Sequence, residues 1–282
     1  ETADQVIDAS NLYVTPGFID LTNHADVYGT LFAIPLQESL LKQGVTTILV
    51  GNCGESLAPV VKKESLNDLE RWTTGFSVPI NWTGVAEYND NIEALGSGLN
   101  VATLVGHDTL RRNADMPAER AFLLENALLE GAWGMSSNFS FAARTSEGEE
   151  EIKGLLKVVK KHDGLYKIHL RDEGRNFLPS VSAAISLARE SGARTVISHL
   201  KAVGRGAWND FPAALRMLRE AQKDGVDISF DVFPYLRTGS MLASFLPSWV
   251  RVQKNDVILQ YLSDKKKRAE IMAEIKNATL HS

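Results

Sequence analysis

Short apolar segments alternate with longer amphipathic segments along most of the chain. The clearest apolar segment, Val45-Thr46-Thr47-Ile48-Leu49-Val50, is almost entirely β-branched, which is typical of a strand. Similar apolar segments occur at residues 17–21, 100–105, 131–136, 164–169, 193–199 and 226–231. The mixed apolar and charged pattern of surface helices occurs at residues 35–43, 84–95, 117–129, 148–161, 178–190 and 212–223. The alternation predicts seven strands connected largely by helices.

The last three predicted strands each end in a polar side chain. His169 and His199 are 30 residues apart, and Asp231 follows 32 residues later, which is the spacing of a strand–helix–strand unit. Parallel strands bring their carboxyl ends to one face, where a (β/α)8 barrel keeps its chemistry. The fold class that follows is α/β, namely a TIM-type (β/α)8 barrel that is incomplete, with seven strands in this chain.

Three regions are expected. Residues 1–16 contain short extended pieces and predict the remnant of a small β subdomain with a lead-in. Residues 17–239 form barrel strands one to seven, and residues 240–282 form a helical insertion before a missing strand eight. Because seven parallel strands would leave an exposed sheet edge, we expect the chain to be a piece of a longer protein.

Composition and charge exclude several classes of protein. The chain has 282 residues, of which 44% are hydrophobic and 23% charged, as is ordinary for a globular protein. Its 30 basic and 35 acidic residues give a net charge of −5, which argues against a nucleic-acid partner. The single cysteine allows no intrachain disulfide. With no long apolar run and no leader-like start, no membrane partner and a cytoplasmic location are predicted. The sequence indicates no oligomeric state.

Potential metal ligands gather at the predicted strand ends. They are His24, Cys53, His107, His169, His199 and Asp231. Imidazole, thiolate and carboxylate groups bind zinc, and a catalytic zinc has three protein ligands and a water. Each residue alone also has a structural explanation, since a lone histidine or cysteine is commonly a core residue. Their shared position at successive strand ends is what predicts a metal site.

The same strand ends carry motifs in a fixed order. They are Pro16-Gly17-Phe18-Ile19-Asp20 with His24, Gly51-Asn52-Cys53-Gly54-Glu55-Ser56, Gly106-His107-Asp108, His169-Leu170-Arg171-Asp172-Glu173, Ser198-His199-Leu200-Lys201 and Asp231-Val232-Phe233-Pro234-Tyr235. Over residues 6 to 275 this order resembles the N-acyl-D-amino-acid deacylases (D-aminoacylases) of the amidohydrolase superfamily. The segment around Cys53 is the most specific part of the resemblance.

The resemblance implies that the barrel is a metal-dependent hydrolase barrel. It also implies zinc-dependent hydrolysis of the amide bond of N-acyl-D-amino acids, which are small-molecule substrates. It places one tightly bound zinc on Cys53, His169 and His199. A second, weaker metal in the family uses two histidines after strand one, here His24 and the position of Thr22, with the bridging cysteine and an aspartate after strand eight. Thr22 is a poor ligand, so one zinc is expected. The aspartate is also the family's general base and lies beyond residue 282, so no catalytic residue of that kind is assigned and the chain alone is expected to be inactive.

Substrate binding is implied for two residues. Lys201 resembles the family's anchor for the substrate carboxylate, although a surface lysine at the start of a loop is the alternative. Tyr235 is the candidate beside it, because its hydroxyl can bond a carboxylate whereas Phe233 cannot.

Further residues are candidates for the pocket or for positioning the ligands. They are Arg171, Asp172, Asp26 and His107, and the sequence leaves open whether these form local ion pairs or structural contacts instead. Asp231 matches none of the family's ligands and is expected to be structural or to support the ligands.

Two alternatives to deacylation remain open. A cyclic amidase of the dihydroorotase or hydantoinase kind carries a carboxylated lysine as metal bridge, but the predicted fourth strand, ending at Met135-Ser136, has none. A catalytically impaired homologue that binds metal or ligand without turnover is favoured by Thr22.

Overall fold

The structure, a computed structural model, describes residues 3–66, 78, 80–138, 146–237, 246–251, 253 and 255–277. The strands in this part of the chain are β1 Phe18–Asp20, β2 Val45–Val50, β3 Asn100–Thr103, β4 Val105–Gly106, β5 Gly134–Asn138, β6 Leu165–His169, β7 Arg194–Ile197 and β8 Ile228–Phe230. They pair in the order β1-β2-β3 and β4-β5-β6-β7-β8, and every pairing is parallel.

The break between the two sheets is one residue long. Leu104 separates β3 from β4, and its amide still donates to the carbonyl of Val50 at 3.0 Å. The two strands are therefore consecutive parts of one barrel strand, and the described residues supply seven strand positions in chain order. This is an incomplete (β/α)8 barrel, as the alternating pattern predicts.

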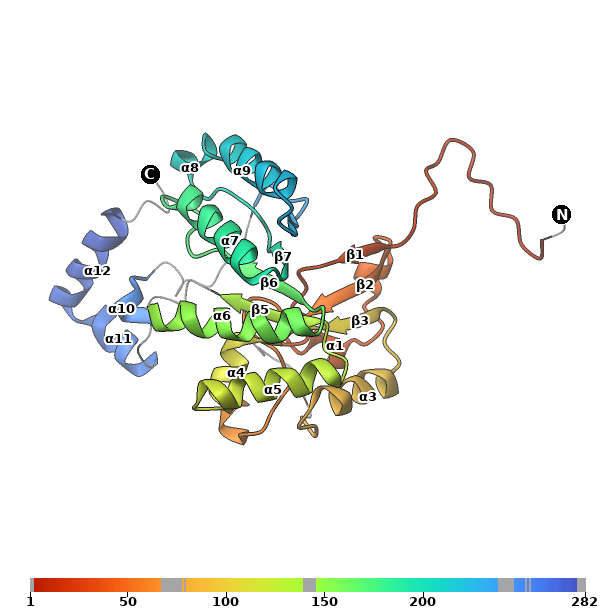
Figure 1. The fold of residues 1–282 in the computed structure, drawn as a ribbon, viewed down its shortest axis with the longest axis horizontal. Coiled ribbons are helices and arrows are strands. Elements are labelled where there is room, and N and C mark those ends of the chain that lie inside the picture. The colour runs from red at the N-terminus through yellow and green to blue at the C-terminus, as the bar shows by residue number, and fades with distance from the viewer. Residues whose placement is uncertain are drawn as a thin grey trace.

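Helices cover the outer side of the strands (Figure 1). The longer ones are α3 Val85–Leu95, α4 His107–Asn113, α5 Pro117–Leu129, α6 Ser146–Lys161, α7 Phe177–Ser191 and α9 Phe211–Lys223. Short helical turns are α1 Thr30–Ala33, α2 Glu38–Leu41, η1 Lys63–Leu66 and α8 Arg205–Trp208. Within the described residues, no helix is long and apolar enough to cross a membrane.

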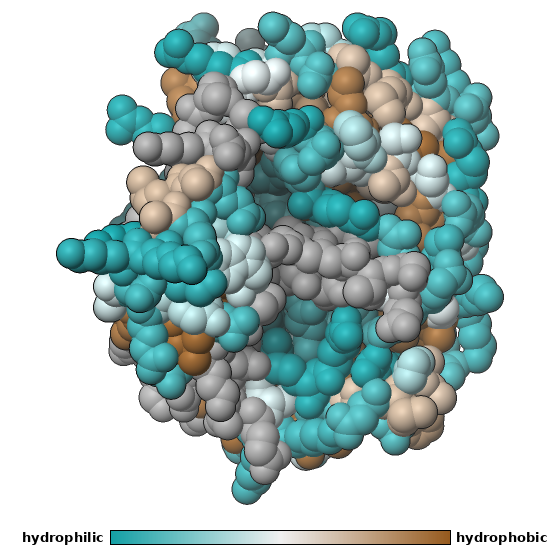
Figure 2. Space-filling model, turned by 90° about the vertical axis from the view of Figure 1, so that its left-hand side faces the viewer, coloured by the Kyte–Doolittle hydropathy of each residue, from teal (hydrophilic) through white to brown (hydrophobic). Residues whose placement is uncertain are grey.

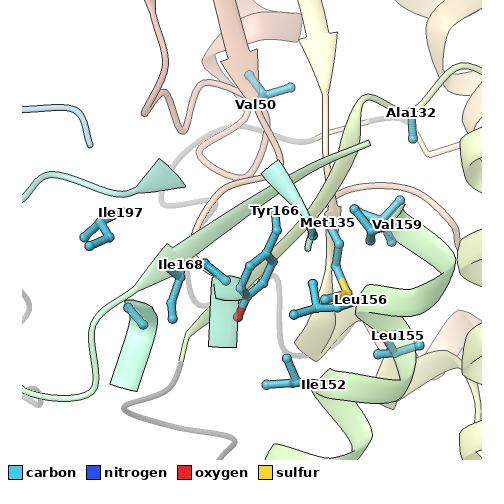
Figure 3. Close-up of a cluster of buried hydrophobic side chains, with 14 of the residues drawn as sticks. Val50, Ala132, Met135, Ile152, Leu155, Leu156, Val159, Tyr166, Ile168 and Ile197 are labelled. Carbon is cyan, nitrogen blue, oxygen red and sulfur yellow. The ribbon is translucent and has the colours of Figure 1, made fainter. Parts of the chain in front are cut away.

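Alternation along β5 and β6 separates the helix-facing side chains from the interior ones. Met135 and Tyr166 are fully buried against α6, where Leu156 is also fully buried (Figure 3). The Tyr166 hydroxyl lies 2.6 Å from Ser137 Oγ, so its polar end is satisfied inside the core. Burying each large apolar side chain contributes about 1.5–3 kcal/mol. This packing fixes β6, and with it the direction in which the intervening residues point.

The two ends of the chain differ. Residues 3–16 form no strand and run away from the body as exposed extended chain (Figure 1), and their assignment to a β subdomain remains a prediction. The carboxyl-terminal helices are α10 Ser248–Arg251, α11 Asn255–Ser263 and α12 Lys265–Asn277. They agree with the helical region expected there, although residues 238–245 and 278–282 lie outside the described part.

Two predicted elements are wrong in extent. The helix expected over residues 35–43 is reduced to α2, because Gln37 has φ 45° directly before it and Gly44 has φ 82° after it. The strand expected over residues 131–136 is displaced to β5. Gly134, at φ 154°, lies so close to the Leu165 carbonyl that a Cβ would be 1.8 Å from its oxygen, and pairing begins only there.

Candidate metal centre

Three residues from three different strand ends converge at the carboxyl side of the barrel. Cys53 follows β2, His169 ends β6 and His199 follows β7. Their ligand atoms all lie within 4.8 Å of one another, and the three side chains are partly buried. In the described part of the chain this is the group of three that can hold a metal ion.

The separations within this trio fit a tetrahedral zinc. Cys53 Sγ lies 3.6 Å from His169 Nδ1 and 3.7 Å from His199 Nε2. Zn–S and Zn–N bonds of about 2.3 and 2.0 Å at a tetrahedral angle put sulfur and nitrogen about 3.5 Å apart. The two imidazole rings are nearly perpendicular, at 79°, with centroids 4.6 Å apart. One sulfur and two nitrogens suit zinc, and a fourth position would remain for water or substrate.

Two of these residues have left-handed backbones. Cys53 has φ 54° and His199 has φ 39°, conformations that non-glycine residues adopt at a cost of about 1–3 kcal/mol. Tight neighbours hold the Cys53 turn in place. Ser136 Oγ accepts from the Gly54 amide at 3.0 Å and donates to the Gly51 carbonyl at 2.5 Å. Strain held by the surrounding structure is common at functional sites.

Glu173 fixes the orientation of His199. Its carboxylate lies 3.1 Å from His199 Nδ1 and 2.6 Å from Lys201 Nζ. With Nε2 facing the trio, Nδ1 carries the proton and donates to Glu173. Burial acts to raise the pKa of Glu173, but the hydrogen bond from His199 and the charge of Lys201 outweigh it and lower the pKa to about 2. The carboxylate is therefore ionised, and a carboxylate behind a ligand histidine is the usual support of a zinc site.

Burial keeps the imidazoles of His169 and His24 neutral. It lowers the pKa of His169 to about 3 and that of His24 to about 4. A neutral imidazole has the free electron pair that metal binding requires. Burial raises the pKa of the Cys53 thiol to about 12, and Lys167 and Lys201 oppose that shift.

His24, the fourth predicted ligand, is not part of the trio. It lies close enough for His199 to influence its pKa, and its ring packs edge-on against Tyr28 at a centroid distance of 6.0 Å. Thr22, at the place of the missing histidine, donates from Oγ1 to Asp231 Oδ2 at 2.9 Å. The role of His24 as a ligand stays a prediction.

The two predicted substrate-binding residues lie in different surroundings. Lys201 is held by Glu173, as described above, and its Nζ is 2.9 Å from His199 Nδ1. Tyr235 follows β8, is 65% exposed, and stacks on Phe233 with centroids 6.4 Å apart. Lys201 is therefore near the trio but already paired. Both substrate roles stay predictions.

Arg171 and Asp172, two of the four pocket candidates, make local contacts. Arg171 pairs with Glu149 of α6. Asp172 Oδ1 accepts from the Gly174 amide at 2.7 Å and Oδ2 from Asn176 at 3.0 Å, which shapes the turn before α7.

The other two candidates are fully buried supports. Asp26 Oδ2 accepts from the Gly51 amide at 2.9 Å and so holds the turn that leads to Cys53. His107 begins α4 rather than ending a strand, and its Nε2 lies 2.8 Å from Glu151, which also binds Arg120. The structure gives His107 a place in an ion network between helices.

Lys167 is the polar residue that the sequence analysis passed over. It is fully buried on β6 and its Nζ lies 2.8 Å from Asp231 Oδ2. Because side chains alternate along a strand, its position two residues before His169 puts it on the same face as that ligand. A lysine within an otherwise apolar strand was the signal that could have found it.

The carboxyl ends of the strands open toward the face drawn in Figure 2. That face is hollowed near its centre, and the visible floor of the hollow is largely hydrophilic. A polar, recessed site at the carboxyl end of parallel strands is where barrel enzymes bind their substrates.

Known proteins are similar to this chain in sequence and in structure. No protein-family model matches the chain. The D-aminoacylase of Alcaligenes xylosoxydans xylosoxydans is 32% identical over 246 residues, covering 84% of this chain and 50% of that protein. A solved D-aminoacylase described as having a binuclear metal center has a TM-score of 0.68 at 30% identity, covering 78% of this chain and 48% of that chain.

A third similar protein was solved with a metal. It is an N-acyl-D-glutamate deacylase from Bordetella bronchiseptica complexed with zinc and a phosphonate inhibitor. Its TM-score is 0.67 at 29% identity, with 78% of this chain and 48% of that chain covered. The chain spans about half the length of the relatives it matches.

The strand order and these similarities define the fold as the barrel of the amidohydrolases, in incomplete form. Within that class, the chain belongs to the D-aminoacylase family, the N-acyl-D-amino-acid deacylases.

Proposed function

We propose that the protein containing this chain hydrolyses the amide bond of N-acyl-D-amino acids with one zinc ion held by Cys53, His169 and His199. The observation that carries the proposal is the spacing of the trio, with sulfur–nitrogen distances of 3.6 and 3.7 Å. The similar proteins are named for deacylation of N-acyl-D-amino acids, and one was solved with zinc.

A bound zinc would polarise the amide carbonyl and make its water acidic enough to supply hydroxide near neutral pH. The chain's own residues would prepare that site. Glu173 holds His199 with its Nε2 electron pair facing the trio, and burial keeps His169 neutral. The resemblance places the carboxylate that accepts the water's proton after the eighth barrel strand, beyond residue 282. That strand is not β8, which is the seventh barrel strand because β3 and β4 count as one.

Lys201 would bind the substrate carboxylate. Its ammonium lies 2.9 Å from His199 Nδ1, and Glu173 shares it at 2.6 Å. An anionic substrate would therefore share this ammonium with Glu173. Tyr235 is exposed and free to add a hydroxyl contact from the loop after β8.

The catalytically impaired homologue remains the second candidate. It is favoured by Thr22, which is tied to Asp231 rather than free to bind a metal. The cyclic-amidase alternative is less favoured, because β5 has no lysine.

The single cysteine, which this site would use, favours action in the cytoplasm, where thiols stay reduced.

The test is turnover by the full-length protein loaded with zinc. Release of free amino acid from N-acetyl-D-amino acids would be measured against the matching L-enantiomers, with Cys53→Ala as the control. The proposal expects turnover of D-substrates that the Cys53→Ala protein lacks. Zinc-loaded, folded protein with no turnover of any N-acyl-D-amino acid would favour the non-catalytic homologue instead.

A further inference from the structure

Lys167 is a charged residue in the interior of the barrel. Lysine is almost never fully buried unless it is paired, yet the Lys167 side chain has no exposed surface. Its neighbours on β6, Tyr166 and Ile168, face the helices, so Lys167 faces inward together with His169. The strand therefore places a cation directly beside the proposed metal ligands.

Oxygen atoms surround the ammonium. Nζ lies 2.8 Å from Asp231 Oδ2 and 3.1 Å from Asn52 Oδ1, and it also donates to Thr22 Oγ1 and to the Leu21 carbonyl. These acceptors follow β1, β2 and β8, so three strand ends meet at one nitrogen. A carboxylate oxygen is also a ligand of zinc, and the other oxygens here are of the kinds that bind divalent cations.

Asp231 connects this cluster to the trio. While Oδ2 binds Lys167 and Thr22, Oδ1 accepts from the His199 backbone amide at 2.5 Å. His199 has the left-handed φ of 39° that needs such support. Through Asp231, Lys167 is linked to His199 of the trio. It also contacts the oxygens of Thr22 and Asn52, where a second ion would have to bind.

We propose that the ammonium of Lys167 is a built-in cation that fills the oxygen-lined place between Thr22, Asn52 and Asp231 and so limits the centre to one metal ion. The inference rests on the proposed function, because it assumes the zinc on Cys53, His169 and His199. A limit of one metal ion would differ from the similar D-aminoacylase, which is described as having a binuclear metal center. A divalent ion next to a fixed ammonium would be repelled strongly in a poorly solvated interior.

The experiment measures the number of zinc ions bound per chain. The purified chain is first equilibrated with a large excess of zinc, and the unbound zinc is then removed. Wild type is compared with Lys167→Ala, which removes the cation and leaves room, and with Lys167→Met, which removes the cation and fills the room. The double variant Lys167→Ala with Asp231→Asn takes away the carboxylate that would hold the new ion. Unfolding is followed in parallel, with and without zinc.

The inference expects a doubling of bound zinc in Lys167→Ala only, while the other three proteins keep a single equivalent. Two equivalents in wild type, or a folded Lys167→Ala that still binds a single equivalent, overturns the inference and leaves the proposed zinc site standing. No zinc in wild type overturns the proposed site and the inference with it. If Lys167→Ala does not fold alone, zinc is counted after refolding in excess zinc: two equivalents support the inference, and one equivalent or no folded protein overturns it.

Discussion

The Nδ1 atom of His199 lies 3.1 Å from the Oε1 atom of Glu173, and this contact turns the opposite nitrogen of the ring toward Cys53. Because Glu173 is only four residues beyond the end of β6, the strand that supplies His169 also leads directly to the support of His199. The two histidines are therefore positioned by one strand and the turn that follows it.

Loss of the Glu173 carboxylate should weaken zinc binding. Glu173→Ala is expected to lower the affinity about 10–100-fold, the usual effect of removing the partner of a ligand histidine, and Glu173→Gln should lose less because it still accepts a hydrogen bond. Competition with a chelator measures this. Asp172→Asn is the matched control, since Asp172 bonds Gly174 and Asn176 rather than a ligand. Equal losses in Glu173→Ala and Asp172→Asn would contradict the assigned role.

Gly51 should be irreplaceable in the turn before Cys53. It has φ 75°, and an added Cβ would lie 2.1 Å from the Leu104 carbonyl oxygen. Gly51→Ala should therefore cost more than the roughly 1–2 kcal/mol of a left-handed residue alone, and should also weaken zinc binding by displacing Cys53. Gly96→Ala is the control, because its φ is 68° and nothing lies within 4 Å. Chemical denaturation and zinc titration of both variants check this. Similar losses of stability and of zinc affinity in the two variants would show that the close approach of Gly51 to the Leu104 carbonyl is unimportant.

The stability contributed by Asp26 and by Asp108 should be lost as the pH rises from about 4 to about 7. Burial is the main cause that raises the pKa of Asp26 to about 7, and the same holds for Asp108. Because each of these two carboxyls is protonated in the folded chain and ionised in the unfolded chain in this window, raising the pH removes the stability that each contributes, on the order of a few kcal/mol. The lowered pKa values of His24 and His169 act in the opposite direction up to about pH 6.5, so the effect is seen as a difference between variants.

Urea unfolding of the metal-free chain across this window measures the slope. Relative to wild type, the stability of the Asp26→Asn chain should fall less, or rise more, as the pH increases, because the contribution of Asp26 is gone while that of Asp108 remains. An unchanged slope in Asp26→Asn would show that Asp26 does not protonate on folding.

The core between α6 and the strands should matter for stability and not for metal binding. Leu156→Ala, at a fully buried position, is expected to cost about 2–5 kcal/mol. Leu129→Ala, on the 70% exposed end of α5, should stay within about 0.5 kcal/mol. Denaturant midpoints give both values. A Leu156→Ala protein that is folded but has lost zinc affinity would mean that the core and the site are coupled more tightly than the contacts indicate.

The sequence was most informative where local and tertiary preferences agree. The helix at residues 117–129 coincides with α5, since Pro117 begins it and the apolar positions share a face. The strand at residues 45–50 coincides with β2. The chain order placed six potential ligands at strand ends, and the family resemblance then selected Cys53, His169 and His199 among them before any geometry was known.

Features that depend on distant backbone contacts could not be predicted. The start of β5 is set by the close approach of Gly134 to Leu165, and no local pattern encodes that contact. The pairing of Lys201 with Glu173 and the contact of Thr22 with Asp231 likewise join segments that only the folded barrel brings together. The charge of Lys167 was readable in the strand, but its four oxygen partners were not.

Zinc content tests the central claim most directly. The purified wild-type chain would be compared with Cys53→Ala and His199→Ala, and with His162→Ala as a control, because His162 contacts Glu125 away from the trio. The account predicts about one zinc per chain, lost in the first two variants and kept in the third. No zinc in wild type, or zinc that survives both substitutions, would contradict a metal centre on Cys53, His169 and His199.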